Sequence, residues 1–297
     1  MTAAATVRTP VVTAAPGIWP SVRIALAVGV AYYLGAKVGF LLTPTPQPVS
    51  TLWPPNAILL GALLLAPLRL WPVVLLSALP VHVASELQSG VPLPMVLGWY
   101  VSNCSEALIG AGLMRMLIDE PIELDTSRRV RIFVVFAALL APLLSSFMDA
   151  GFVKWLEWGS GTYWDVWRSR FLSNVLAILA IVPVMVTWGN RGIRSLASVS
   201  RSRILEAVLL MSALFVVSVT VFAGPAWGFQ TWPILIFAPM PFLLWAAVRF
   251  GPAGTSACLL VFSLLSVWGA IHGQGPFVGQ PMSSNVLPLQ LFLIVTY

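Results

Sequence analysis

The sequence predicts an all-α fold, a polytopic transmembrane helical bundle of about ten membrane-embedded helices, and three observations predict it. Of the 297 residues, 59% are hydrophobic and only 9% are charged, whereas a soluble protein carries roughly 25% charged residues. The apolar residues form long runs separated by short connections, and the mean hydropathy is +0.92. Positive charges gather in alternate connections, as the orientation rule for membrane proteins requires.

Residues 1–20 are rich in Ala, Thr and Pro and are predicted to be a mobile cytoplasmic tail, and residues 21–297 one integral membrane domain. The first five membrane segments are expected at 21–42, 55–68, 70–87, 95–117 and 130–149. The first carries Gly35 and Gly39 in a GxxxG spacing, which allows close approach of another helix. The second is short; it begins at Trp53-Pro54-Pro55 and turns back at Arg69.

The remaining segments are expected at 166–189, 203–223, 231–248, 251–271 and 286–297. Between the two groups, the aromatic stretch 150–165 suits a helix lying on the outer membrane surface. A weak repeat relates Thr51-Leu52-Trp53-Pro54 followed by Arg69 to Gln230-Thr231-Trp232-Pro233 followed by Arg249. Ordinary anchoring of Trp-Pro pairs at a membrane surface is the favoured explanation of this repeat.

The charge pattern predicts which side each connection faces. With a cytoplasmic N-terminus, twelve of the 16 Lys and Arg residues lie in the cytoplasm: Arg8, Arg23, Arg69, Arg115, Arg128, Arg129, Arg131, Arg191, Arg194, Arg201, Arg203 and Arg249. Connections 43–54, 88–94, 224–230 and 272–285 carry none. We therefore expect a multi-pass protein of a bacterial inner membrane with both termini cytoplasmic, and we attribute the positive charge to orientation rather than to nucleic-acid binding.

Polar residues inside the membrane segments are the candidate functional residues, because such groups are costly in lipid. All are expected in the outer half of the bundle, where they would line one outward-opening ligand pocket: Lys37, His82, Glu86, Asn103, Glu106, Arg168, Arg170 and Asn174. A purely structural role as ion pairs between helices remains the alternative. Glu106 is the deepest, and its polar partner is expected among Asn103, Arg168, Arg170 and Lys37.

Motifs for catalysis or cofactor binding are not found in the sequence: no phosphate-binding loop, dinucleotide fingerprint, HExxH or CxxC. His82, Glu86, Glu106 and His272 could ligate a metal, but the two histidines are far apart in sequence, so no metal site is predicted. We therefore expect no enzymatic activity, catalytic residue or cofactor for this chain.

Several local motifs together resemble a known family, the membrane-associated sensor domains of the first type (MASE). They are AYYLGAKVGFLL, STLWPPNAILLGALLL, RLWP, SNCSEALIGAGLMRML, RFGPAGTSACLL, GQGPF and LPLQLFLIV, in this order. The resemblance covers the chain from about residue 21 to its end. One departure is Asn174, which stands where the family resemblance leads us to expect Asp.

The resemblance implies a sensory input module that detects a periplasmic or intramembrane stimulus and passes it to a cytoplasmic effector. That effector, a histidine kinase or a cyclic-di-GMP enzyme, is expected after residue 297 or on a separate chain. Other expected partners are the lipid bilayer, a small ligand or membrane protein, and a second copy of the chain. A small-solute secondary transporter is the alternative function, and a polar path through the inner half would favour it.

Overall fold

The computed structural model describes residues 18–43, 50–159, 161–191, 199–224, 233–277 and 283–297, and the described residues contain helices and no strand. Residues 1–17 of the predicted tail lie outside this description. The helices, in chain order, are α1 (Ile18–Leu41), α2 (Pro54–Leu65), η1 (Leu68–Leu70), α3 (Trp71–Gln88), α4 (Leu93–Leu117), α5 (Ser127–Ile132), η2 (Phe133–Leu140), α6 (Ala141–Trp155), α7 (Tyr163–Arg191), α8 (Arg201–Phe222), η5 (Pro233–Phe237), α9 (Met240–Ile271) and α10 (Ser283–Thr296).

The multi-pass, all-helical architecture is confirmed, but the count of about ten membrane segments is not. Within the part of the chain that the structure describes, six helical stretches are long and apolar enough to cross a membrane, whereas α2 has 12 residues and the apolar part of α10, Val286–Thr296, is also short. α4 is 25 residues long but carries polar residues, among them Asn103 and Glu106. The sequence located the apolar runs well, yet some of them are too short or too polar to cross alone.

Proline and arginine set several helix boundaries. Proline occupies the first turn of α2, α3, α4 and α9, where its missing N–H needs no partner. α2 ends at Leu65 because Ala66 precedes Pro67 and is extended, with ψ of 141°, as the residue before a proline commonly is. Arg115 then donates to the carbonyl oxygen of Ala66, and at 3.3 Å to that of Leu63. Trp71 Nε1 also donates to Leu63 O at 3.0 Å, so the inner end of α2 is fixed by two side chains.

α5, η2 and α6 form one continuous helix with a wide π-helical stretch in the middle. Thr126 caps its start by accepting from the backbone N–H of Arg129 at 3.4 Å. The π-helical stretch directly precedes Pro142, which removes one backbone donor from the ladder. Residues 150–155 are the last turn of this helix, so the separate surface helix expected at 150–165 is not present.

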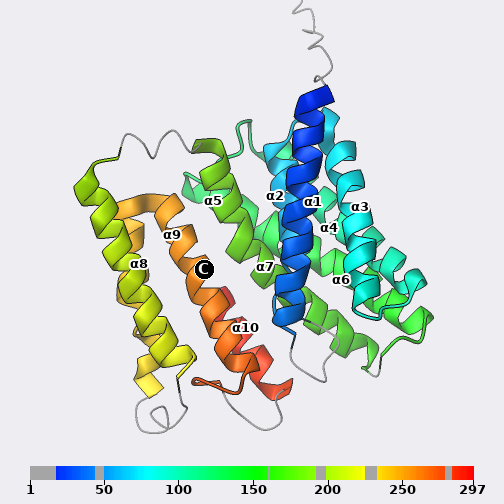
Figure 1. Ribbon diagram of the computed structural model, residues 1–297. Coiled ribbons are helices and arrows are strands. Elements are labelled where there is room, and N and C mark those ends of the chain that lie inside the picture. Colours follow the sequence, from blue (N-terminus) through cyan, green and yellow to red (C-terminus); the bar gives the residue numbers. More distant parts are fainter. Residues whose placement is uncertain (1–17, 44–49, 160, 192–198, 225–232, 278–282) are drawn as a thin grey trace, which may run out of the picture.

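α9 folds back on itself at Gly251, whose φ of 61° interrupts the helix (Figure 1). Glycine adopts this left-handed region without the steric penalty of a side chain. The two arms of α9 match the two segments expected at 231–248 and 251–271. Residues 225–232 lie outside the described part, so the second copy of the Trp-Pro repeat is described only from Pro233.

α7 is the central helix, and α2, α6, α9 and α10 all pack against it. All residues from Leu172 to Ala180 are buried, which is the pattern of a helix surrounded by protein on every side. α1 and α3 form one flank, and α8 with the first arm of α9 forms the other (Figure 1). The start of α1, the end of α7 and the start of α8 lie at the same end of the bundle, as the predicted orientation requires.

Candidate functional site

Among the described residues, the buried acidic, basic and histidine side chains all lie within the first seven α-helices: His82, Glu86, Glu106, Asp149 and Arg170. They come from α3, α4, α6 and α7, and the structure divides them into a carboxylate centre, a histidine network and a cavity.

The carboxylate centre is Glu106, which is fully buried on α4 and bonded to three neighbouring helices. Its Oε1 accepts from Asn56 Nδ2 of α2 at 3.0 Å, and its Oε2 accepts from Asn174 Nδ2 of α7 at 2.8 Å. Oε2 also accepts from the hydroxyl of Ser145 on α6. All three donors are neutral, and none of the ion pairs within the described ranges includes Glu106.

A second buried carboxylate, Asp149, lies one helical turn beyond Ser145 on α6. On the facing helix α4, Ser102 lies one turn before Glu106 and donates to the carbonyl oxygen of Ser145 at 3.1 Å. The two carboxylates therefore occupy the same α4–α6 interface. Oδ1 of Asp149 has no hydrogen-bond partner in the structure.

The histidine network joins α1, α3 and α4. His82 Nε2 faces the carbonyl oxygen of Val96 at 2.9 Å, and His82 Nδ1 faces the hydroxyl of Tyr32 at 2.9 Å. Because a carbonyl oxygen only accepts, Nε2 carries the hydrogen, and a neutral ring then accepts at Nδ1 from Tyr32. Asn103 Nδ2 completes the chain by donating to the Tyr32 hydroxyl at 3.2 Å.

A cavity of about 270 Å³ lies beyond these two groups, toward the α1–α2 and α3–α4 connections. Glu86 and Arg170 give it one carboxylate and one guanidinium, and the remaining lining residues are Phe40, Thr43, Ser50, Trp53, Ser89, Val91, Trp99 and Trp158. This volume is near the lower end of ligand pockets, which hold roughly 300–1,000 Å³. The cavity therefore suits a small polar solute.

Tryptophan side chains hold Arg170 in this cavity. The guanidinium lies 4.1 Å from the centroid of the Trp99 ring, and Trp99 meets Trp158 edge-to-face at 5.0 Å. Nε of Arg170 has no hydrogen-bond partner in the structure, although the residue is buried. The Nε–H group of Arg170 is therefore a hydrogen-bond donor without an acceptor, in a residue that lines the cavity.

Trp53 is buried rather than facing lipid, which corrects its interpretation as a membrane-surface anchor. The ring packs against Gly39 of the GxxxG motif, where an added Cβ would lie 2.5 Å from Trp53 Cε3. A Cβ at Gly35 would lie 2.5 Å from Ile58 Cδ1 and 3.2 Å from Pro54. The two glycines therefore let α1 contact the start of α2, where Pro54 and Pro55 are buried.

The eight predicted site residues do not converge on one cavity. Glu86 and Arg170 line it, Glu106 and Asn174 form the carboxylate centre, and His82 and Asn103 belong to the histidine network. Lys37 instead donates to Gln88 Oε1 at 2.8 Å, at an exposed edge between α1 and α3. Arg168 is exposed and pairs with Asp165 at 3.4 Å.

The expectation that Glu106 has a polar partner is confirmed, but the partners named for it were wrong. Asn56 and Ser145 were missed because neither is ionisable, and Asn174 was assigned to the pocket rather than to Glu106. An amide within the apolar run PPNAILL is the sequence signal that points to Asn56.

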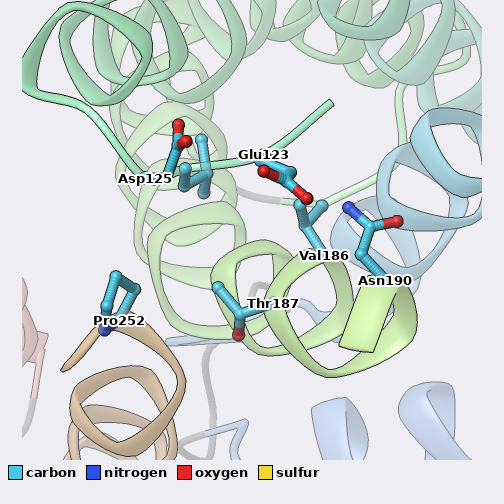
Figure 2. A pocket seen from close by; sticks show the side chains of 7 residues that line it. Glu123, Asp125, Val186, Thr187, Asn190 and Pro252 are labelled. Carbon is cyan, nitrogen blue, oxygen red and sulfur yellow. The ribbon is translucent and has the colours of Figure 1, made fainter. Parts of the chain in front are cut away.

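A second, smaller cavity of about 110 Å³ lies near the other end of the bundle, beside the last turns of α7. Figure 2 shows Glu123 and Asp125 of the α4–α5 connection on one side of it, and Thr187 and Asn190 of α7 on the other. Arg129 pairs with Asp125 at 2.9 Å, and Asn190 Nδ2 donates to the carbonyl oxygen of Ile122 at 2.7 Å. These contacts hold the connection against α7, so we assign the second cavity a structural role.

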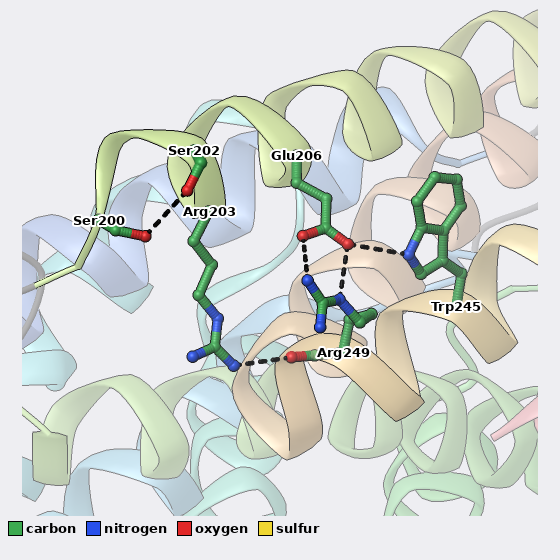
Figure 3. A network of polar contacts seen from close by, with 6 residues as sticks. All are labelled: Ser200, Ser202, Arg203, Glu206, Trp245 and Arg249. Carbon is green, nitrogen blue, oxygen red and sulfur yellow. Dashed lines mark hydrogen bonds and ion pairs between the residues drawn. The ribbon is translucent and has the colours of Figure 1, made fainter.

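Arg249 belongs to a clamp between α8 and the first arm of α9 (Figure 3). Its guanidinium donates to both carboxylate oxygens of Glu206 at 2.7 Å, and Trp245 Nε1 also donates to Glu206, at 3.2 Å. Arg203 donates to the backbone carbonyl of Arg249 at 3.0 Å, two residues before the break at Gly251. The clamp fixes the turn of α9 and lies among exposed side chains.

Among the described residues, no group of three or more His, Cys, Asp and Glu side chains is arranged to hold a metal ion. Comparison with known proteins gives one match: the family model described as MASE1 matches residues 24–297. No curated protein and no solved structure matches the chain.

Proposed function

The chain belongs to the MASE1 family of membrane sensor domains, and from that premise we propose that it is the input module of a bacterial signalling protein. A stimulus from the periplasm or from within the membrane is detected in the first seven α-helices. The output passes to a cytoplasmic effector, a histidine kinase or a cyclic-di-GMP enzyme, in cis or in trans. Both termini face the cytoplasm in this proposal, and the membrane is the inner membrane.

The stimulus in this proposal is a small polar solute bound in the 270 Å³ cavity. Glu86 and Arg170 supply charges of opposite sign, and Trp53, Trp99 and Trp158 supply aromatic walls. Such a lining suits a zwitterionic or hydrogen-bonding ligand, because each charged end finds a complement out of bulk water. The unmet donor at Nε of Arg170 is a further contact point.

The observation that carries the proposal is one hydrogen bond between the cavity wall and α10. Gln290 Nε2 donates to the carbonyl oxygen of Thr51 at 2.8 Å, and Gln290 is buried. Thr51 lies between Ser50 and Trp53, which both line the cavity. A ligand that moves this segment therefore acts directly on α10, and it shifts the equilibrium if it binds the two positions with different affinity.

The packing beyond the cavity favours a sensor over the alternative, a small-solute transporter. On the far side of Glu106, α2 buries Leu59, Leu60 and Leu63, and α7 buries Leu176 and Ile178. The acidic, basic and histidine side chains buried in the described ranges all belong to the cavity side or to the Glu106 level. A transporter would need a polar path through this apolar layer.

α8 offers a surface for lipid or for a second copy of the chain. Only 22% of its apolar window is buried, compared with 67% for α7. Ile204, Val208, Phe215 and Val216 are among its exposed side chains.

Reporter fusions after Pro92 and after Ala197 test the proposed orientation of the chain in the membrane. The two fusions should report opposite sides of the membrane.

The test of the sensor proposal joins residue 297 to a diguanylate cyclase through helical linkers of increasing length, so that every rotational register of α10 is sampled. Cyclic-di-GMP is measured in cells grown on a panel of carbon sources and osmolarities. Glu86→Gln and Arg170→Ala should change basal output or abolish the response. Arg168→Ala is the matched control, since Arg168 lies two residues away and is exposed. Normal output and response from both cavity variants, at wild-type membrane levels, would refute the ligand site.

A further inference from the structure

The buried charges of the first seven α-helices do not balance. Glu86, Glu106 and Asp149 are buried carboxylates, whereas Arg170 is the buried guanidinium among the described residues. His82 is satisfied as a neutral ring by Val96 and Tyr32. Because a buried charge without compensation is strongly destabilising, each carboxylate that Arg170 does not compensate needs either a proton or a bound cation.

The imbalance is sharpest at Glu106. Arg170 lines the cavity with Glu86 and stacks on Trp99, whereas Glu106 receives hydrogen bonds from neutral donors alone. Those bonds orient the carboxylate but add no charge to neutralise it. The missing charge therefore belongs beside Glu106.

A second observation points to the chemistry of what supplies that charge. Four oxygen atoms on the three helices that bond to Glu106 are buried and lack any hydrogen-bond partner in the structure: Asn56 Oδ1, Asn174 Oδ1, Asp149 Oδ1 and the Ser146 hydroxyl. The amide nitrogens of Asn56 and Asn174 bond to the Glu106 carboxylate, so the amide oxygen of each residue lies close by, on the side of the amide that faces away from that bond. Few buried polar atoms of native proteins lack partners, so these oxygens need a bound ion or a water molecule.

The donor set is entirely oxygen. Carboxylate, amide and hydroxyl oxygens suit hard cations, and they do not suit metals that prefer sulfur or imidazole. The groups that contact the Glu106 carboxylate are all neutral, and Asp149 is not among them, whereas calcium sites use several carboxylates in a larger shell. A monovalent alkali cation fits this charge. Rotation of either Asn amide would turn its oxygen toward the ion, because the two orientations of an amide have almost the same shape.

We propose that Glu106, with the side-chain oxygens of Asn56, Ser145, Ser146 and Asn174, binds one sodium ion where α2, α4, α6 and α7 meet. The ion joins the start of α2, next to the cavity wall, to the central helix α7. This site is distinct from the cavity of Glu86 and Arg170, and it does not depend on the sensor proposal.

The experiment measures binding of ²²Na⁺ to the purified chain in nanodiscs at pH 6 and pH 8, with choline chloride holding the ionic strength constant. Saturable binding of one ion per chain is expected, stronger at pH 8 because protons compete for the carboxylate. Glu106→Gln should abolish it. Ser146→Ala, a milder change, should weaken it at least several-fold. Asp165→Asn removes an exposed carboxylate and should leave binding unchanged.

Three results would overturn the sodium site. Absence of saturable binding by the folded wild-type chain would mean that a proton, rather than an ion, neutralises Glu106. Binding that survives in folded Glu106→Gln, or is untouched by Ser146→Ala, would place the ion elsewhere. Displacement of the sodium by an equal concentration of calcium would show a divalent site instead.

Discussion

The first seven α-helices and the C-terminal helices α8 to α10 are built on different interiors. The first part buries carboxylates, a guanidinium, an imidazole and two amides of the predicted site. In the C-terminal part, the described buried polar residues are four serines and Gln290. Its centre is aromatic: Phe222, Phe262 and Phe292 pack within 5.2–6.2 Å of one another.

The two parts also differ in how far their buried polar atoms are satisfied. Of the side chains with buried, unpartnered N or O atoms, all but Ser218 belong to the segment that ends with α7. In the C-terminal part, Ser256 and Ser266 donate to carbonyls of their own helix at 3.1 and 2.8 Å, and Ser263 meets the Tyr297 hydroxyl at 2.8 Å. In the sensor proposal, the part with unsatisfied hydrogen-bonding groups takes up the ligand, and the better satisfied C-terminal part transmits the movement.

The largest expected effect tests whether packing alone holds the C-terminal part together. Phe262→Ala should lower the free energy of unfolding by about 3–5 kcal/mol, because it removes a buried aromatic ring and leaves a cavity. Sodium binding at Glu106 should be unchanged in the folded fraction. The measurement is a titration with SDS in mixed micelles, followed by circular dichroism. Phe215→Ala is the control, since Phe215 is 49% exposed; equal losses in both variants would contradict the comparison.

The next effect tests the polar interior. Asn56→Leu should cost about 1.5–3 kcal/mol in the same titration, because Glu106 loses one of its hydrogen-bond donors while remaining buried. The double variant Asn56→Leu with Glu106→Leu should recover much of that loss, since apolar groups then replace both partners. If the double variant were less stable than Asn56→Leu alone, the loss in Asn56→Leu would not come from the missing hydrogen bond to Glu106.

A smaller effect tests the close approach of α1 to α2. Gly39→Ala should cost about 1–2 kcal/mol, because the added methyl group meets the Trp53 ring and overpacks the contact. It should also alter output in the cyclase fusion, because Trp53 lines the cavity. Gly112→Ala is the matched control, since nothing lies within 4 Å of a Cβ placed there. If Gly39→Ala had the stability and the output of the wild type, the packing of Trp53 against α1 would not matter for the function of the cavity.

The smallest effect concerns the exposed clamp of Figure 3. In moderate salt, Glu206→Gln should have an unfolding midpoint that cannot be distinguished from that of the wild type, because ions and water screen an exposed ion pair. The same titration compares it with Asn56→Leu. A loss as large as that of Asn56→Leu would show that the C-terminal part also depends on charge.

Most helix positions could be predicted from the sequence, because apolar runs and prolines determine them locally. The break of α9 fell at Gly251, the first residue of the second expected segment, where Gly251 is followed by Pro252. The end of α2 was placed three residues late, although Pro67 marks it locally, because a residue before proline disfavours the helical conformation. The contact of Arg115 with the carbonyl oxygen of Ala66 comes from a helix about fifty residues further along the chain and leaves no signal in the run itself.

The sequence predicted several of the residues that form the site, but not how these residues are arranged in space. Depth along each helix correctly selected Glu86, Glu106 and Arg170 as buried, but it gave no information on which face each residue uses. Lys37 and Arg168 lie at similar depths and face outward, toward Gln88 and Asp165. To predict the hydrogen-bond partners of Glu106, one must know which helices surround α4, and that depends on the topology of the whole bundle.

The hydrogen bond from Gln290 to Thr51 joins residues 239 positions apart in the chain. During synthesis the N-terminal helices enter the membrane first, so the carbonyl of Thr51 has no such donor until α10 has left the ribosome. The wall of the cavity therefore reaches its final position last, after the aromatic C-terminal part has assembled. A chain released before α10 would contain every charged residue of the cavity, yet it would lack the hydrogen bond that links the cavity wall to α10, so in the proposed sensor an incomplete molecule has no such route for its output.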